Sequence, residues 1–322
     1  MRRRRAKAVV VGVNYYKSDN VKNLFGCVSD AYEVKTVLER DADGTKNFDV
    51  VLETAVDENS AIDRRKLKDL ILDVFNEDNP EIALFYFSGH GYLEDSGGYL
   101  VTSDCEDGDQ GLSMTEILGY ATASKALNKI IILDCCHSGK MGSPGAETSV
   151  TICEGMTILT ASTDKQYASE IDGSGLFTKL FVDALMGGAA NILGNITPGS
   201  VYAHIDQSLG EFGQRPMFRT NVKTFISLRE VNPSVSLSDL RRITELFPAR
   251  EEHLLEPSYE PTSDNADKNN CEKFEIMQSY NRVGLVVPID SDHMYYAAIN
   301  SKSCKLTALG EHYWNLVKND RI

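Results

Sequence analysis

The stretch from Lys129 to Gly139 most constrains how this chain can fold. It contains four consecutive apolar side chains, Ile-Ile-Ile-Leu, which end at Asp134 and are followed by Cys135, Cys136 and a His-Ser-Gly turn. A short apolar run bounded by turn residues is typical of a strand buried on both faces of a parallel sheet. In open α/β folds, ligands and reactive groups lie just beyond the carboxyl ends of such strands. The run therefore predicts an α/β fold with a thiol at the sheet edge where chemistry is expected.

A second segment, residues 83–91, has the same pattern. Its apolar run Ala-Leu-Phe-Tyr-Phe is followed by Ser-Gly-His-Gly, so that His90 stands between two glycines that allow a sharp bend. If the two strands are neighbours, His90 and a cysteine face each other across one crevice. Such a pair predicts nucleophilic catalysis, in which the imidazole takes the thiol proton and the thiolate attacks a carbonyl carbon.

Residues 86–91 and 134–139 resemble the two catalytic motifs of the caspase-like cysteine peptidases, in particular the metacaspases and the bacterial orthocaspases. His90 lies 46 positions before Cys136, close to the roughly 50 residues typical of caspase-type enzymes. The resemblance implies a mostly parallel sheet flanked by helices, with Cys136 as nucleophile and His90 as its acid–base partner. It also implies that the backbone N–H groups of Gly89 and Cys136 hold the oxyanion. His137 fits the role of base less well, because adjacent residues on a turn usually point apart.

Three further positions match the family's pocket for the residue before the cut bond. They are Asp30, within the segment Leu-Phe-Gly-Cys-Val-Ser-Asp-Ala at 24–31, together with Ser88 and Asp134. Two carboxylates and a hydroxyl suit a guanidinium, so the resemblance implies cleavage after arginine or lysine. Two plainer interpretations stay open. Asp30 could simply occupy the first turn of a helix, where the macrodipole favours a carboxylate, and Asp134 could cap the turn that follows it.

Composition narrows the class of protein. The formal net charge of −14 argues against nucleic acid as the main partner and favours basic peptides. Seven cysteines without framework spacing favour a reducing cytoplasm, and no stretch approaches the roughly 18 apolar residues of a membrane span. The acidic loop 104–109 lacks the alternation of an EF-hand, and Cys135, Cys136 and His137 lack zinc-site spacing. We therefore predict a cytoplasmic protein that acts on proteins or peptides and uses no metal or cofactor.

Changes in composition divide the chain into three parts. Residues 1–232 are expected to form the peptidase domain, and residues 233–270 a helical segment followed by a linker rich in Pro, Ser, Asp and Asn. Residues 271–322 are expected to form a small α+β module that resembles a winged helix, with 283–288 and 293–299 paired as a hairpin. Because the module has no basic stripe, we expect it to bind a protein activator or inhibitor rather than DNA.

The sequence thus predicts a cysteine endopeptidase regulated by a C-terminal module, and the resemblance makes a role in bacterial stress or antiviral defence a hypothesis. One alternative is a catalytically silent scaffold that recruits partners, although the intact His90 and Cys136 disfavour it. Another is a redox-sensing thiol protein that uses Cys135 and Cys136. Adjacent cysteines rarely form a disulfide easily, and Cys135 is expected to be a buried packing thiol.

Overall fold

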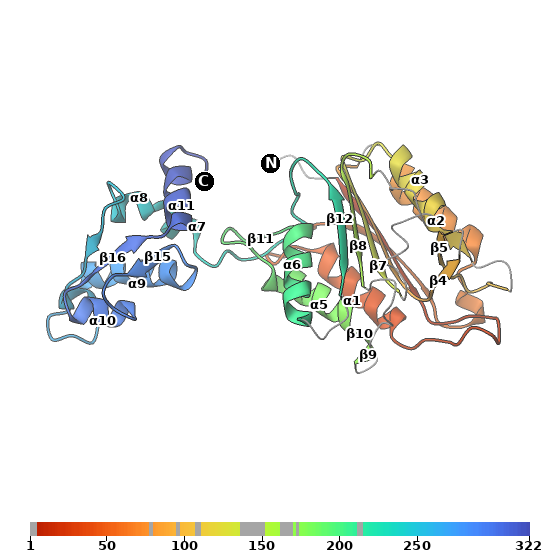
Figure 1. The fold of residues 1–322 in the computed structure, drawn as a ribbon, viewed down its shortest axis with the longest axis horizontal. Coiled ribbons are helices and arrows are strands. Elements are labelled where there is room, and N and C mark those ends of the chain that lie inside the picture. The colour runs from red at the N-terminus through yellow and green to blue at the C-terminus, as the bar shows by residue number, and fades with distance from the viewer. Residues whose placement is uncertain are drawn as a thin grey trace. The chain divides into compact units, whose positions relative to one another are not determined.

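The computed structural model describes eight ranges of the chain. These are residues 5–76, 80–94, 97–106, 111–135, 152–161, 170–171, 174–210 and 215–322. Its contacts divide the chain into two compact units, of which the first comprises Met1–Ala190 and Asn195–Val231 and the second comprises Asn191–Gly194 and Asn232–Ile322. Figure 1 shows the elements of both units.

A six-stranded sheet forms the centre of the first unit. In spatial order its strands are β12 (Met217–Asn221), β8 (Met156–Thr160), β7 (Asn128–Asp134), β3 (Ile82–Ser88), β1 (Ala6–Val13) and β2 (Asp49–Ala55). Neighbouring strands are parallel, except that β12 runs antiparallel to β8. The predicted mostly parallel sheet is confirmed.

The two strands that carry the motifs, β3 and β7, lie side by side at the centre of this sheet. Every residue of β3 is buried, as the continuous apolar run predicts for a central strand. The register places Ser88 opposite Asp134. Both motifs therefore leave the sheet at the same edge, which is where the chemistry of such folds is found.

Helices cover both faces of the sheet because successive strand residues point to opposite sides. On one face, α2 (Arg64–Asn76) and α3 (Met114–Ala123) pack against side chains such as Val9 and Phe85. On the other face, the side chains of Val10 and Tyr86 pack with three helices. These helices are α1 (Cys27–Glu39), α5 (Leu176–Asp183) and α6 (Pro198–Leu209). Figure 1 shows α2 and α3 on the opposite side of the sheet from α1, α5 and α6.

Shorter elements complete the first unit. They are η1 (Glu58–Ser60), β4 (Gly91–Glu94), β5 (Gly97–Leu100), β6 (Leu112–Ser113), β9 (Glu170–Ile171), β10 (Ser174–Gly175), the π-helical turn η2 (Ala184–Gly188), β11 (Asn195–Ile196) and β13 (Arg229–Glu230). Strands β4, β5 and β6 form a small antiparallel sheet that begins directly after His90. Strand β10 pairs with β9 and leads into α5.

The second unit has its own core and its own sheet. Its elements are α7 (Leu237–Arg241), α8 (Ile243–Leu246), β14 (His253–Leu254), η3 (Pro257–Tyr259), α9 (Lys268–Arg282), β15 (Val286–Pro288), α10 (Met294–Ile299), β16 (Ser303–Leu306) and α11 (Ala308–Lys318). The strands lie in the antiparallel order β14-β16-β15. Phe274, Tyr280 and Trp314 are among the side chains that fill the core.

The structure differs from the sequence prediction in two parts of this unit. The predicted hairpin is wrong, because 293–299 contains the helix α10 and β15 pairs with β16 instead. Met294, Ala297 and Ala298 are buried, and this i, i+3, i+4 spacing is that of a helix face. Residues 256–270, expected as a linker, contribute to the unit's packing. The ring of Tyr259 contacts that of Phe274 at a centroid distance of 6.3 Å.

The resemblance of this unit to a winged helix stays a prediction. None of the helices in the described ranges is both long enough and apolar enough to cross a bilayer.

Candidate active site

His90 lies at the carboxyl end of β3, where a loop from β1 holds its ring. Its Nε2 lies 2.7 Å from the carbonyl oxygen of Lys22. Because a carbonyl oxygen can only accept a hydrogen bond, Nε2 must carry a hydrogen, and the lone pair of the neutral ring is then on Nδ1. In this tautomer the imidazole can accept a thiol proton at Nδ1.

Tyr16, which the sequence analysis missed, contacts His90 in two ways. Its hydroxyl oxygen accepts a hydrogen bond of 2.8 Å from the backbone N–H of His90, and the two ring centroids are 4.8 Å apart. The same hydroxyl donates to the carbonyl of Val13, at the end of β1, over 3.3 Å. Burial is the main cause that raises the pKa of Tyr16 well above its usual value, so the hydroxyl keeps its hydrogen. A tyrosine just after a strand that ends at the same sheet edge was the available signal.

Neighbouring side chains leave no room for a Cβ at Gly89. A Cβ at this position would lie 2.8 Å from the ring of Phe87 and 2.9 Å from the hydroxyl of Tyr16. The backbone N–H of Gly89 donates to the carbonyl of Asp134 over 3.3 Å, which extends the ladder between β3 and β7. For the expected oxyanion role, this bond would have to open.

The structure brings Asp30, Ser88 and Asp134 together. The hydroxyl of Ser88 donates to Oδ2 of Asp30 over 3.1 Å, and Ser88 pairs with Asp134 across the sheet. The exposed fractions are 2% for Asp30, 1% for Ser88 and 6% for Asp134. Asp30 does lie in the first turn of α1, as the plainer interpretation had it, but its carboxyl is buried against the sheet. The three side chains form one cluster, and one of them, Ser88, is the last residue of β3 and precedes His90 by two positions.

Burial gives Asp30 an unusual proton affinity. Desolvation, followed by the negative charge of Asp134, raises the pKa of Asp30 to about 7, against a smaller lowering by hydrogen bonds from Gly175 and Ser88. A buried carboxylate is costly unless a cation or several donors compensate it. This cluster is therefore suited to accept either a proton or a positively charged group.

Two residues at the start of α5 complete the cluster, and the sequence analysis missed both. The backbone N–H of Gly175 lies 3.3 Å from Oδ1 and 3.4 Å from Oδ2 of Asp30. The hydroxyl of Thr178 donates to Oδ2 of Asp134 over 2.6 Å. The one available signal was a polar residue, Thr178, on the apolar face of a helix, between Phe177 and Phe181.

The predicted nucleophile Cys136 and the alternative base His137 lie outside the described residues. Cys135 is described, is only 2% exposed and belongs to the core between the sheet and the helices α2 and α3. This burial agrees with a packing role. It disfavours the redox alternative, which requires an accessible pair of thiols.

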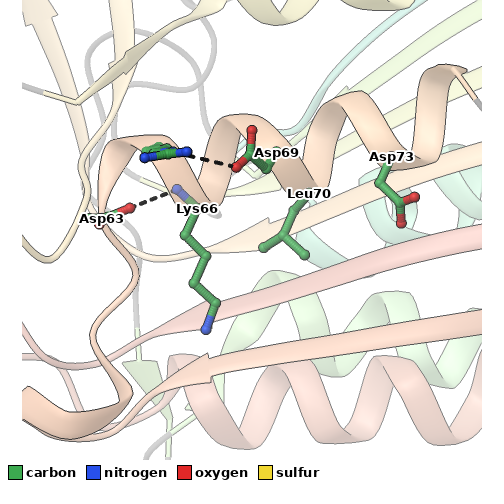
Figure 2. Close-up of a pocket in the computed structure, with 6 residues that line it drawn as sticks. Asp63, Lys66, Asp69, Leu70 and Asp73 are labelled. Atoms are coloured by element: carbon green, nitrogen blue, oxygen red, sulfur yellow. Dashed lines mark hydrogen bonds and ion pairs between the residues drawn. The ribbon is translucent and has the colours of Figure 1, made fainter.

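A separate hollow lies along α2, on the face of the sheet opposite α1 and α5. It has a volume of about 380 Å³ and is lined by Asp63, Arg65, Lys66, Asp69, Leu70 and Asp73. Figure 2 shows this part of α2 in close-up. The charges of the lining are paired locally, since Nζ of Lys66 lies 2.7 Å from Glu53 and Arg65 lies 4.0 Å from Asp69. Asp63 accepts a hydrogen bond of 2.6 Å from the backbone N–H of Lys66. Within the ranges the structure describes, no cluster of three or more His, Cys, Asp or Glu side chains could hold a metal ion.

Comparisons with known proteins agree with this geometry. A family model described as "Caspase domain" matches residues 5–226, which belong to the first unit except for Asn191–Gly194. Among solved structures, protein GSU0716 from Geobacter sulfurreducens is 17% identical with a TM-score of 0.50, over 71% of this chain and 98% of that chain. Caspase-1 from Spodoptera frugiperda is 14% identical with a TM-score of 0.50, over 71% of this chain and 91% of that one. At these identities the likeness is one of fold. Among curated proteins, none matches the sequence.

Proposed function

The chain belongs to the caspase domain family through residues 5–226, a family of cysteine peptidases, and from this premise we propose that it is an endopeptidase that cleaves proteins after arginine or lysine. The observation that carries the proposal is the buried cluster of Asp30, Ser88 and Asp134, which lies at the end of the strand that leads to His90.

The catalytic groups we assign are Cys136 and His90. Nδ1 of His90 takes the thiol proton, and the thiolate attacks the carbonyl carbon of the bond to be cut. The N–H of Cys136 stabilises the oxyanion, joined by that of Gly89 if its bond to Asp134 opens. His90 then gives its proton to the leaving amine, and water hydrolyses the resulting thioester. The hydrogen bond from Nε2 to the carbonyl of Lys22 supports this assignment, because Nε2 then carries the hydrogen and the lone pair of the neutral ring is on Nδ1.

The preference for arginine or lysine follows from charge. Two carboxyls so close together and so deeply buried are stabilised by a cation. A guanidinium can donate hydrogen bonds to both of them. An aspartate side chain in the same place would add a third negative charge without compensation. A peptidase specific for aspartate would need a cationic group in place of these carboxyls.

We assign regulation to the second unit. Apart from Asn191–Gly194, it lies beyond the family match, and it has its own hydrophobic core. These features support its role as a module that binds a protein activator or inhibitor.

Hydrolysis of fluorogenic peptides that differ only in the residue before the cut bond tests the proposal. The residues to compare are arginine, lysine, aspartate and asparagine, with wild type, Cys136→Ala and Cys135→Ala side by side. We expect cleavage after arginine or lysine that disappears in Cys136→Ala and persists in the neighbouring control Cys135→Ala. Cleavage after aspartate would contradict the pocket assignment. Cleavage of no peptide, with calcium and candidate partners added, would favour the scaffold alternative.

A further inference from the structure

We propose that Tyr86 and Thr178 form a hydroxyl relay that keeps Asp134 as the permanent anion of the pocket and leaves Asp30 as its proton acceptor. A substrate cation that enters the pocket then displaces a proton from Asp30. The inference deepens the proposed function and rests on it in one respect, since the cation is the arginine or lysine side chain of the substrate. Neither Tyr86 nor Thr178 was among the site residues predicted from the sequence.

The direction of the relay follows from counting hydrogens. The hydroxyl of Thr178 has one hydrogen, which it donates to Oδ2 of Asp134 over 2.6 Å. The hydroxyl oxygens of Tyr86 and Thr178 are 2.5 Å apart, so Tyr86 must be the donor in that bond. Both residues are fully buried, and burial is the main cause that raises the pKa of Tyr86 well above its usual value. Tyr86 therefore keeps its hydrogen, and both bonds run toward Asp134.

The two carboxyls are too close to be ionised equally. A Cβ built on Gly175 would lie 2.5 Å from Oδ2 of Asp134 and 3.4 Å from Oδ2 of Asp30, so one point adjoins both oxygens. Neighbouring buried carboxylates favour a state in which one holds a proton. The carboxyl with the stronger donors stays ionised. Asp134 accepts a bond of 2.6 Å from the relay, whereas Asp30 accepts bonds of 3.1 Å from Ser88 and at least 3.3 Å from Gly175.

The titratable and polar groups near Asp30 belong to several different elements that pack around it. Asp134 is on β7, Glu33 is on α1, Ser88 and Tyr86 are on β3, and Gly175 and Thr178 belong to β10 and α5. Burial and then the charge of Asp134 raise the pKa of Asp30 to about 7, and the charge of Glu33 adds to them. The net effect supports a proton on Asp30 in the free protein at and below neutral pH.

The relay therefore makes substrate binding depend on pH in a defined direction. Below pH 7, Asp30 is mostly protonated and the pair carries one negative charge. Above pH 7 it carries two, and the substrate cation binds more tightly. KM for an arginine peptide should fall as the pH rises through 7, whereas kcat follows the state of His90 and Cys136.

The first test needs no peptidase activity. Infrared absorption of protonated carboxyl groups in the full-length protein, with the double variant Asp30→Asn/Asp134→Asn subtracted, gives the midpoint at which the pair of carboxyls loses its last proton. Without the charge-assisted hydrogen bond from Thr178, Asp134 competes with Asp30 for that proton, so the midpoint of the pair should move upward by about one pH unit in Thr178→Val. Thr178→Ser should restore it. Thr157→Val is the matched control, because Thr157 is a buried threonine whose hydroxyl contacts Thr220 at 2.9 Å. An unchanged midpoint in Thr178→Val would overturn the relay.

The second test measures the kinetics of an arginine peptide between pH 6 and pH 9. Thr178→Val should raise KM about fivefold at pH 7, an effect that fades toward pH 9 while kcat stays constant. The two tests separate the two proposals. A shifted infrared midpoint in a protein that cleaves no peptide would keep the relay and remove the peptidase function. Cleavage after arginine with an unmoved midpoint would keep the function and remove the relay.

Discussion

Asp30 is a carboxyl that folding buries at a cost in stability. Burial raises its pKa from 3.8 to about 7, so folding favours its protonated form. The protonated carboxyl contributes its full stabilisation below pH 4, and this contribution is lost as the pH rises through 7. The total loss in unfolding free energy is roughly 4 kcal/mol. The stability lost at Asp30 is consistent with a functional role for this carboxyl, and the cation site proposed above supplies one.

We therefore expect Asp30→Asn to stabilise the first unit at alkaline pH. Relative to the variant, wild type should lose about 3 kcal/mol of unfolding free energy between pH 5 and pH 8. Urea unfolding followed by far-ultraviolet circular dichroism measures this difference. The same variant should lose cleavage after arginine. Equal dependence of stability on pH in both proteins would mean that Asp30 is ionised throughout.

Tyr16 orients His90 through its hydroxyl as well as its ring. In Tyr16→Phe the ring remains, but the backbone N–H of His90 loses its acceptor and the carbonyl of Val13 loses its donor. We expect kcat to fall about tenfold with little change in KM, as measured by steady-state kinetics on an arginine peptide. Tyr15→Phe, in the same loop, is the matched control. Equal kcat in the two variants would contradict the positioning role of Tyr16.

At the scale of elements, the sequence predicted those strands whose burial leaves a pattern within a few consecutive residues. β3 and β7 are central strands, and burial on both faces produces the continuous apolar runs from which they were predicted. The helix α10 was missed because it spans only Met294–Ile299 and contains two tyrosines and an isoleucine, which are common in strands. In so short a segment, packing decides between helix and strand.

The parts of the site that escaped prediction depend on contacts between distant elements. Thr178 meets Tyr86 across 92 positions of sequence, and Gly175 meets Asp30 across 145. No local pattern encodes such a meeting, because it depends on how the start of α5 docks at the sheet edge. The resemblance to a family identified Asp30, Ser88 and Asp134 only because they belong to short motifs.

Gly12 shows how closely β1 and α1 pack. A Cβ at this position would lie 2.4 Å from the carbonyl oxygen of Cys27 and 2.8 Å from the Cβ of Ala31. Gly12 also pairs with Ser88 in the sheet. Gly12→Ala must therefore separate the helix that carries Asp30 from the strand beside Ser88.

We expect Gly12→Ala to lower the unfolding free energy by about 1–3 kcal/mol and to raise KM for an arginine peptide. Chemical denaturation and steady-state kinetics measure the two effects. Gly119→Ala in α3 is the control, because no heavy atom lies within 4 Å of its added Cβ, and it should be neutral or stabilising. A loss in Gly12→Ala no greater than in Gly119→Ala would show that β1 and α1 can separate freely.

At the scale of the whole molecule, the chain builds separate cores. The first unit has one core on each face of its sheet, and the second unit has a third. The second unit also includes Asn191–Gly194, whose Ile192 and Leu193 pack against its core. This short segment comes from the middle of the sequence of the first unit. Composition alone placed the division of the chain near residue 232. It could not show that Asn191–Gly194 belongs to the second unit.

Separate cores predict that the two units respond separately to core mutations. The chain's one tryptophan, Trp314, is buried in the second unit, where its indole N–H donates to the carbonyl of Phe247 over 2.7 Å. Tryptophan fluorescence therefore reports unfolding of that unit. Loss of peptidase activity on heating reports the first unit.

Two buried phenylalanines provide matched variants, since Phe274 is 1% exposed in the second unit and Phe85 is fully buried in the first. Truncation of either to alanine should cost about 3–5 kcal/mol in its own core. We expect Phe274→Ala to lower the midpoint of the fluorescence transition and Phe85→Ala to lower that of activity loss, each with little effect on the other. Equal shifts of both midpoints in both variants would mean that the two units unfold as one. The second unit could then regulate the peptidase only by changing the stability of the whole chain.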